Sequence, residues 1–304
     1  MQLPKAVTIK EVGPRDGLQN EKTLVSVADK VEWINMLSNC GLPYIEVTSF
    51  VNPKWIPALA DCYEVATSIE RKRGVTYAAL VPNEKGLEKA LEANLDEISV
   101  FMSASETHNK KNINKSITET YPILERVVQE ALLAKKSVRG YVSTVFGCPY
   151  EGNIEIDQVM RVSEKLFEMG ISELSLGDTI GVANPKQVQL LLVQFLKRFP
   201  TNKLALHFHD TRGLALANIY ATLQMGITTF DSSIGGLGGC PYAPGASGNV
   251  ATDDVNYMLK KMDIETNIDD RKLLDAARFI EARLQKKLMS HSMVVNANQC
   301  IDRV

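Results

Sequence analysis

The stretch LALHFHD, residues 204–210, places two histidines two positions apart at the end of an apolar run. Side chains at i and i+2 of a β-strand point to the same face, so a strand here directs His207 and His209 the same way. Two imidazoles on one face suit a divalent metal ion. An H-x-H motif is short, however, and two structural histidines at a strand end are the competing interpretation.

Helical patterns flank this stretch at residues 187–199 and 213–225. The same alternation continues along the whole chain, where short β-branched runs and amphipathic segments follow one another. Strands are expected at residues 7–12, 44–49, 75–81, 97–103, 138–146, 172–178, 204–210 and 228–235. Helices are expected at residues 25–39, 57–73, 84–93, 117–136, 155–169, 185–199, 214–225 and 252–262.

Eight strands with eight crossover helices predict an α/β fold, a TIM (β/α)8 barrel, which typically takes ~250 residues. We expect a single TIM-barrel catalytic domain over residues 1–304, with the barrel at about 5–265 and a C-terminal helical extension at about 266–304. That extension carries one additional helix, 271–287. An open doubly wound sheet is the alternative, but no G-x-G-x-x-G follows the first strand.

Composition limits the classes of partner. The chain of 304 residues is 45% hydrophobic and 23% charged, and its 34 basic and 36 acidic residues leave a net charge of −2. This balance provides no electrostatic surface for nucleic acid or an anionic membrane. Small molecules and copies of the chain itself are therefore the expected partners, with a homodimer the expected assembly.

Location and redox state follow from the same reading. No apolar run approaches the ~20 residues of a membrane span, and the N-terminal residues resemble no targeting leader, so a cytoplasmic location is expected. The five cysteines are scattered and form no C-x-x-C. An odd number without such spacing argues against a disulfide framework or a structural zinc site, and predicts reduced thiols.

In a (β/α)8 barrel the carboxyl ends of all strands meet on one face, where active sites lie. Charged groups buried there need a partner, either one another or a cation. Polar residues expected on this face are Glu11, Arg15, Asp16, Gln19, Glu46, Ser49, Asp178, Thr179, His207, His209 and Asp210.

Asp16, His207 and His209 make a candidate cation site, to which Asn249 could add an amide oxygen. A carboxylate with two imidazoles suits Mg²⁺, Mn²⁺, Fe²⁺ or Zn²⁺. A salt-bridged cluster that caps the barrel is the alternative. Arg15 could stabilise an oxyanion beside this site or form a surface ion pair. Glu46 lies within an apolar strand and needs a cationic partner, for which Arg15 is the candidate.

The glycine-rich segment 235–249 contains Pro241 and Pro244 and no following G-K-[ST], so a nucleotide loop is not expected. Its glycines favour a lid over the site, with Cys240 near the middle. A cysteine beside a metal and an arginine can have a lowered pKa, although most cysteines have no such role.

Isolated polar residues carry weaker predictions. His108 and His291 stand in polar surroundings, and we expect both to be exposed to solvent. Four lysines, three of them in an expected loop after the fourth strand, are either a solvated charge run or countercharge for an anionic cofactor's phosphates. They are Lys22, Lys110, Lys111 and Lys115.

Four motifs together resemble a known family. They are EVGPRDGLQNE (11–21), IEVTSF (45–50), HFHDTRG (207–213) and SIGGLGGCPYAPGASGNVATDD (233–254). They are similar to those of the 3-hydroxy-3-methylglutaryl-CoA lyases, within the metal-dependent superfamily named for an Asp-Arg-Glu triad in a TIM barrel. The similarity spans nearly the whole chain, and the last motif is specific to the lyase branch.

The resemblance implies roles for particular residues. The ligands of a divalent metal, Mg²⁺ or Mn²⁺, would be Asp16, His207, His209 and Asn249. Arg15 would polarise the thioester carbonyl and its enolate, Glu46 would complete the triad, and Cys240 would be the catalytic cysteine of the loop. Candidate substrate-binding residues are Arg15, Gln19, Lys22, Ser49 and Thr179.

The implied reaction is the metal-dependent retro-Claisen cleavage of (S)-3-hydroxy-3-methylglutaryl-CoA to acetoacetate and acetyl-CoA, as in leucine degradation or ketone-body metabolism. Asp16 or His207 could be the base, and Cys240 or a metal-held water the proton donor. A condensing 2-isopropylmalate, citramalate or homocitrate synthase is one alternative, although those enzymes resemble RDGEQ where this chain reads RDGLQ. A lyase for a longer-branched substrate and an inactive binding barrel are the others.

Overall fold

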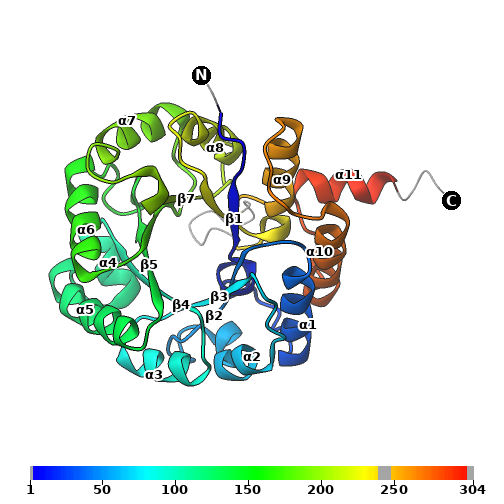
Figure 1. Cartoon of the computed structure of the whole chain (residues 1–304), viewed down its shortest axis with the longest axis horizontal. Coiled ribbons are helices and arrows are strands. Elements are labelled where there is room, and N and C mark those ends of the chain that lie inside the picture. Colours follow the sequence, from blue (N-terminus) through cyan, green and yellow to red (C-terminus); the bar gives the residue numbers. More distant parts are fainter. Residues whose placement is uncertain (1–2, 239–247, 300–304) are drawn as a thin grey trace.

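The computed structural model describes residues 3–238 and 248–299, in which eight parallel strands form a closed barrel in sequence order from β1 to β8. β1 pairs with both β2 and β8, which closes the sheet. Figure 1 shows the strands at the centre and the helices around them. The predicted (β/α)8 fold is therefore confirmed. The strands are β1 (Thr8–Glu11), β2 (Tyr44–Ser49), β3 (Thr76–Leu80), β4 (Glu97–Ser103), β5 (Ser137–Ser143), β6 (Glu173–Asp178), β7 (Leu204–Phe208) and β8 (Thr229–Ser232).

The helices of the outer layer begin at local signals in the sequence. Ser116 and Asn184 each open a helix with a capping box, in which the side chain three residues later bonds back to the cap. The α-helices are α1 (Val27–Ser38), α2 (Cys62–Ser68), α3 (Glu84–Glu92), α4 (Glu106–Ile113), α5 (Ile117–Leu133), α6 (Ile156–Met169), α7 (Pro185–Phe195), α8 (Ala215–Leu223), α9 (Thr252–Lys261), α10 (Asp270–Leu284) and α11 (His291–Gln299).

Two helices were not predicted from the sequence. The segment of α4, ETHNKKNI, has too few apolar residues to show a helical period, yet Ser105 caps it and two of its side chains are buried. One of these is His108, which is only 7% exposed, so the expectation of a solvent-exposed histidine was wrong. Lys110 and Lys111 lie on this helix instead of in a loop, and both are exposed.

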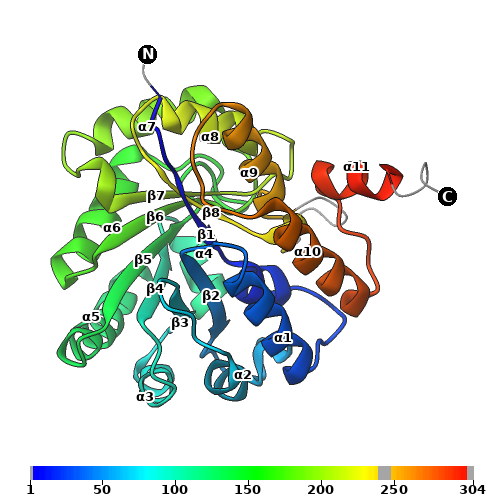
Figure 2. The same cartoon turned by 45° about the vertical axis from the view of Figure 1, so that its right-hand side comes forward.

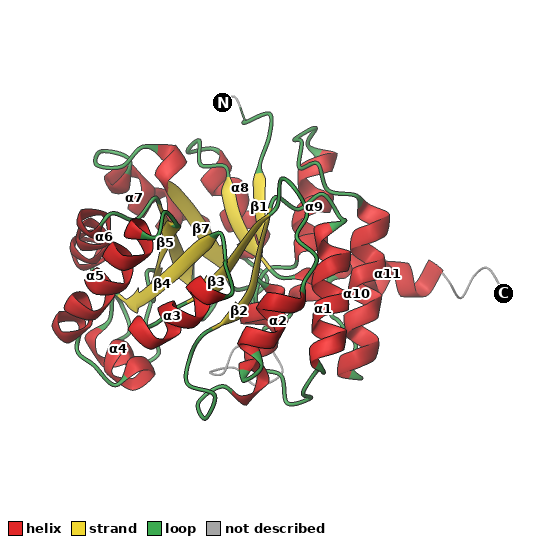
Figure 3. Ribbon diagram, turned by 60° about the horizontal axis from the view of Figure 1, so that its bottom comes forward, coloured by secondary structure: helices red, strands yellow, loops and turns green. Residues whose placement is uncertain are grey.

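The second unpredicted helix, α11, follows α10 at the C-terminal end. The carboxylate of Asp254 on α9 accepts hydrogen bonds from the backbone N–H groups of His291 and Ser292 at its start. His291 itself is exposed, as expected, and its Nδ1 lies 3.0 Å from Asp254. Figure 2 shows α11 beyond the ring of helices, and Figure 3 shows α10 beside α1.

The interior of the barrel is unusually polar beneath its carboxyl face. The guanidinium of Arg139 on β5 donates to Asp231 on β8 at 2.7 Å and to Glu173 on β6 at 2.6 Å. Lys10 of β1 also donates to Glu173 at 2.7 Å. Arg139 and Asp231 are almost completely buried. Opposite charges thus compensate one another where a barrel more often carries branched aliphatic side chains.

Within residues 3–238 and 248–299, none of the helices combines the length and hydrophobicity that crossing a bilayer requires. The cysteines in these ranges, Cys40, Cys62 and Cys148, are free and buried. Cys240 and Cys300 lie outside the described residues.

The turn between α1 and β2 generates a prediction about stability. Gly41 and Gly74 have nearly the same φ, +90° and +89°, but a Cβ on Gly41 would lie 2.1 Å from the carbonyl oxygen of Asn267, whereas one on Gly74 would meet nothing within 4 Å. Gly74→Ala should cost ~1–2 kcal/mol for the backbone conformation alone. Gly41→Ala should cost ~1–3 kcal/mol more, because the segment before α10 must shift. Urea unfolding of both variants measures the difference, and equal losses would contradict the close approach.

Candidate active site

A five-residue π-helical turn, Gly13–Gly17, carries Arg15 and Asp16 directly after β1. The backbone N–H groups of Asp16 and Gly17 both donate to the carbonyl of Val12. The turn packs closely against the segment after β8, since a Cβ on Gly17 would lie 2.8 Å from Ser233 Oγ. This contact joins the first and last strands at the carboxyl face of the barrel.

Glu11 connects the turn after β1 to the segment after β8 through hydrogen bonds. Its buried carboxylate accepts hydrogen bonds from Gly13 N at 2.8 Å, Ile234 N at 3.1 Å and Thr252 Oγ1 at 2.6 Å. Burial raises the pKa of Glu11 to about 7, although the three hydrogen bonds oppose the rise. The turn that carries Arg15 and Asp16 is therefore fixed to η4 (Ile234–Gly236) and to the start of α9.

The structure brings the three predicted cation ligands together. One ligand atom from each of Asp16, His207 and His209 lies within 4.8 Å of the others. The Nε2 atoms of both imidazoles are 3.9 Å from Asp16 Oδ2. Asn249 forms an isolated bridge with His209, and its Nδ2 donates to Asp16 Oδ2 at 2.7 Å. The carboxyl ends of β1 and β7 and the segment before α9 thus meet at one point.

The charge states of these groups fit a cation. Burial would raise the pKa of Asp16, but Arg15 and the two histidines lower it to about 2, so the carboxylate is charged at neutral pH. Burial and the neighbouring His207 lower the pKa of His209 to about 3, which leaves that imidazole neutral, the form that binds metals. A salt bridge between Asp16 and a protonated His209 is therefore not favoured.

Buried polar atoms without hydrogen-bond partners also support a bound cation at this site. Among the described residues, Asn249 Oδ1 and the Nδ1 atoms of His207 and His209 are buried and have no hydrogen-bond partner. Such atoms are costly unless an ion, a water molecule or a ligand occupies the space beside them. A carboxylate, two imidazoles and an amide oxygen fit a hard or borderline divalent cation.

Arg15 and Glu46 form a buried ion pair beside the cation site, as the sequence predicted. Arg15 Nε lies 2.5 Å from Glu46 Oε2, and the guanidinium also donates to Asp16. Burial by itself would lower the pKa of Arg15, but the two carboxylates raise it, so the side chain stays charged. Tyr141 on β5 completes the group, because its hydroxyl donates to Glu46 at 3.3 Å.

The predicted substrate-binding residues differ in accessibility. Ser49 is fully buried, and its hydroxyl donates to the Leu80 carbonyl at 3.3 Å. Thr179 Oγ1 is buried and has no hydrogen-bond partner among the described residues. Gln19 is partly buried after the Gly13–Gly17 turn, and Lys22 is exposed beyond it. Cys240 lies outside the described residues.

Sequence reasoning missed three residues that surround the site. Tyr141 contacts Glu46 and, with Arg139, alternates along β5 toward the barrel interior. Asp231 on β8 lies 3.4 Å from His207 Nδ1. Arg139 in VRGYV and Asp231 in TFDS show the same sequence signal as Glu46, a charged side chain inside an otherwise apolar strand.

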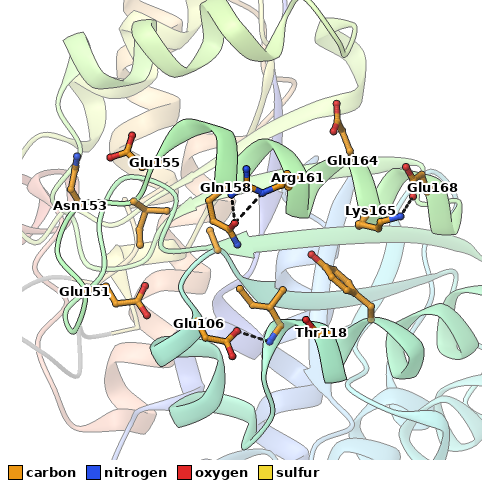
Figure 4. A pocket seen from close by; sticks show the side chains of 14 residues that line it. Glu106, Thr118, Glu151, Asn153, Glu155, Gln158, Arg161, Glu164, Lys165 and Glu168 are labelled. Carbon is orange, nitrogen blue, oxygen red and sulfur yellow. Dashed lines mark hydrogen bonds and ion pairs between the residues drawn. The ribbon is translucent and has the colours of Figure 1, made fainter.

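A separate groove of about 710 Å³ opens beside α6 and is shown in Figure 4. No candidate catalytic or metal residue lines it. Its lining contains five glutamates and two basic residues, of which Lys165 pairs with Glu168 and Arg161 bonds to Gln158. The phosphates of a CoA molecule would be repelled by this excess of negative charge. The groove is therefore unsuited to an acyl-CoA.

Fold and site together define a (β/α)8 barrel with a candidate divalent-cation site and a buried arginine at the carboxyl ends of its strands. Residues 6–280 match the HMGL-like family. Hydroxymethylglutaryl-CoA lyase YngG of Bacillus subtilis is 63% identical over 295 residues, which cover 97% of this chain and 99% of that protein. The chain belongs to the HMGL-like family, and the resemblance inferred from the four motifs is confirmed.

Two further relatives bear on the substrate. A Pseudomonas aeruginosa protein named 3-hydroxy-3-isohexenylglutaryl-CoA/hydroxy-methylglutaryl-CoA lyase is 51% identical over 286 residues, covering 94% of this chain and 95% of that protein. A solved HMG-CoA lyase from Acinetobacter baumannii, in complex with coenzyme A and 3-methylmalate, has a TM-score of 0.91 and 40% identity. The match covers 96% of this chain and 95% of that chain.

The raised pKa of Glu11 generates a prediction about pH. The folded protein retains the Glu11 proton up to about pH 7, whereas the unfolded chain releases it near pH 4.5. The stabilisation from this group is therefore fully present below pH 4.5 and lost as the pH rises through 7. The free energy of unfolding of the wild type, relative to Glu11→Gln, should fall between pH 4.5 and 7 and be level above. Urea unfolding across this range measures it, and parallel curves would contradict the assignment.

Proposed function

We propose that the protein is a hydroxymethylglutaryl-CoA lyase that cleaves (S)-3-hydroxy-3-methylglutaryl-CoA to acetoacetate and acetyl-CoA. The observation that carries the proposal is the charged Arg15, held by Glu46 and placed directly beside the cluster of Asp16, His207 and His209. A retro-Claisen cleavage needs a cation at the alcohol and a second, fixed positive charge at the thioester. The similarity to hydroxymethylglutaryl-CoA lyases over almost the full chain supports the same reaction.

The chain's own residues supply distinct parts of this chemistry. The tertiary hydroxyl of the substrate loses its proton, the bond between C2 and C3 breaks, and its electron pair moves to C2 as the thioester enolate. Arg15 is positioned to stabilise the enolate oxygen, since its guanidinium keeps its charge at any working pH. The Glu46 carboxylate holds Arg15 in place, and the Tyr141 hydroxyl in turn donates a hydrogen bond to Glu46.

Proton transfer begins and ends the reaction. Asp16 and His207 are our candidates for the base, and whichever of them accepts the proton must do so with a lone pair that the cation does not engage. Cys240 is our candidate for the donor that protonates C2 of the enolate. A divalent cation held by Asp16, His207, His209 and Asn249 would supply the positive charge that makes the tertiary hydroxyl more acidic.

A lyase for a longer-branched 3-hydroxyglutaryl-CoA is the second candidate, supported by the printed name of the Pseudomonas aeruginosa relative. The condensing synthases of the superfamily are not favoured, because the chain carries RDGLQ and the lyase loop, and an inactive barrel would not need to retain every ligand. Contact of the substrate with Gln19, Lys22, Ser49 and Thr179 belongs to the proposal. So do Mg²⁺ or Mn²⁺ as the metal, a homodimer, a cytoplasmic location and a role in leucine degradation.

One assay tests the proposed function. The purified protein should release acetoacetate and acetyl-CoA in equal amounts from (S)-3-hydroxy-3-methylglutaryl-CoA. Treatment with a chelator followed by desalting should abolish the release, and Mg²⁺ or Mn²⁺ should restore it in the wild type but not in His209→Ala. Incubation of acetyl-CoA with 2-oxo acids should give no condensation product. Full turnover in metal-free protein would contradict the metal site.

Arg15→Lys separates transition-state stabilisation from binding. Lysine retains a charge but loses the planar guanidinium that bonds to two partners at once, so kcat should fall by ~10²-fold or more while KM changes little. The affinity for Mn²⁺, measured by calorimetry, should stay close to the wild-type value. Arg198→Lys, an exchange of an exposed arginine paired with Glu164, is the matched control and should turn over normally. A raised KM with normal kcat would reduce Arg15 to a binding residue.

A further inference from the structure

His207 and Asp231 are direct partners in the register between β7 and β8. Neighbouring residues in register direct their side chains to the same face of a sheet, here the interior of the barrel. Asp231 Oδ2 lies 3.4 Å from His207 Nδ1. The other ring nitrogen, Nε2, lies on the cation side, 3.9 Å from Asp16 Oδ2. The imidazole therefore stands between a carboxylate on β8 and the candidate cation site.

The carboxylate of Asp231 is held rigidly from its other side. Arg139 donates to both of its oxygens, at 2.7 Å and 3.3 Å, and Ser175 Oγ donates to Oδ2 at 2.7 Å. The side chain of Asp231 is completely buried. A buried carboxylate with a bidentate arginine stays charged and has little freedom to turn away. It therefore presents a fixed negative charge to His207 Nδ1.

This arrangement distinguishes the two tautomers of a neutral His207. With the proton on Nδ1, the N–H faces the carboxylate and the Nε2 lone pair faces the cation site. With the proton on Nε2, the lone pair of Nδ1 would face a negative oxygen. The separation of 3.4 Å exceeds the usual hydrogen-bond length of about 2.9–3.0 Å, but only the first tautomer makes the contact attractive. The Nδ1 atoms of His207 and His209 both lack a hydrogen bond with ordinary geometry among the described residues, but only His207 has a carboxylate near Nδ1. The carboxylate contact of His209 is made by Nε2, which lies 3.9 Å from Asp16 Oδ2.

We propose that Asp231 is a positioning residue that keeps the proton of His207 on Nδ1 and thereby turns the Nε2 lone pair toward the cation site. The inference rests on the proposed metal-dependent function. Carboxylates that accept from the outer nitrogen of a metal-binding histidine fix its tautomer, and their loss costs ~10–100-fold in metal affinity. The role assigns His207, rather than His209, as the ligand that is oriented before the metal binds.

The competing explanation is that Asp231 only compensates the charge of Arg139 inside the barrel. Glu173 allows a matched control, because its carboxylate also pairs with Arg139. It lies away from His207, since His207 is in register with Gly177, near the other end of β6. Asp231→Asn and Glu173→Gln each remove one negative charge that neutralises Arg139, and each preserves the shape of the replaced side chain. Both should lower the midpoint of thermal unfolding, but only Asp231→Asn should affect His207.

The experiment is performed on the full-length metal-free protein labelled with ¹⁵N-histidine, with the His207 signals assigned from His207→Gln. Long-range ¹H–¹⁵N spectra should show the Nδ1–H tautomer in the wild type and in Glu173→Gln, and a shift toward Nε2–H in Asp231→Asn. The Kd for Mn²⁺, measured by calorimetry, should rise ~10–100-fold in Asp231→Asn and less than about twofold in Glu173→Gln.

Three results would overturn the inference. An Nε2–H tautomer in the wild type would do so without any variant, which keeps the test decisive if Asp231→Asn does not fold. An unchanged tautomer and Mn²⁺ affinity in Asp231→Asn would leave Asp231 as a core anchor, and equal losses in Glu173→Gln would show a general loss of structure. Neither readout requires turnover. A protein that binds Mn²⁺ through a Nδ1–H His207 but releases no acetoacetate refutes the proposed function and not this inference.

Discussion

The ion pair between Arg15 and Glu46 is the interaction on which the site depends. A guanidinium is stable inside a barrel only when carboxylates neutralise its charge. Here Arg15 forms ion pairs with both Glu46 and Asp16. Loss of one partner from such a buried pair costs ~3–5 kcal/mol, because the remaining charge has no compensation. Asp16 is shared between Arg15 and the cation cluster, so the position of the arginine and the position of the ligands are set together.

The same coupling extends downward through the barrel. Arg139 donates hydrogen bonds to Asp231, and Asp231 lies beside His207. The rings of Tyr141 and His207 are nearly perpendicular, at a centroid distance of 6.4 Å. Arg15, Glu46 and Asp16 lie at the carboxyl face beside the candidate cation site. Arg139 and Asp231 lie deeper in the barrel and orient His207. Both groups use residues from several strands, so the geometry of the site follows from the register of the closed sheet.

The sequence predicted the barrel and the main site residues because both leave local signals. Alternation of strand and helix patterns is visible without tertiary information, and Asp16, His207 and His209 stand at strand ends where such groups need an explanation. Helix α4 was not predicted because its segment has too few apolar residues to show a helical period, although Ser105 caps it and Asn109 is buried. The role of Asp231 depends on a register between two strands separated by a whole helix, which no local pattern encodes. Cys240, which the motifs single out, lies outside the described residues.

The tight turn after β1 has a consequence for adaptation and for protein engineering. Replacement of glycine by alanine is an ordinary route to greater thermal stability, because it restricts the unfolded chain. That route is closed at Gly13 and Gly17, where an added methyl group would collide with Glu11 and with Ser233 and Leu237. A substitution that stabilises the protein in this way therefore has to lie outside this turn, because Gly13 and Gly17 have no space for a side chain.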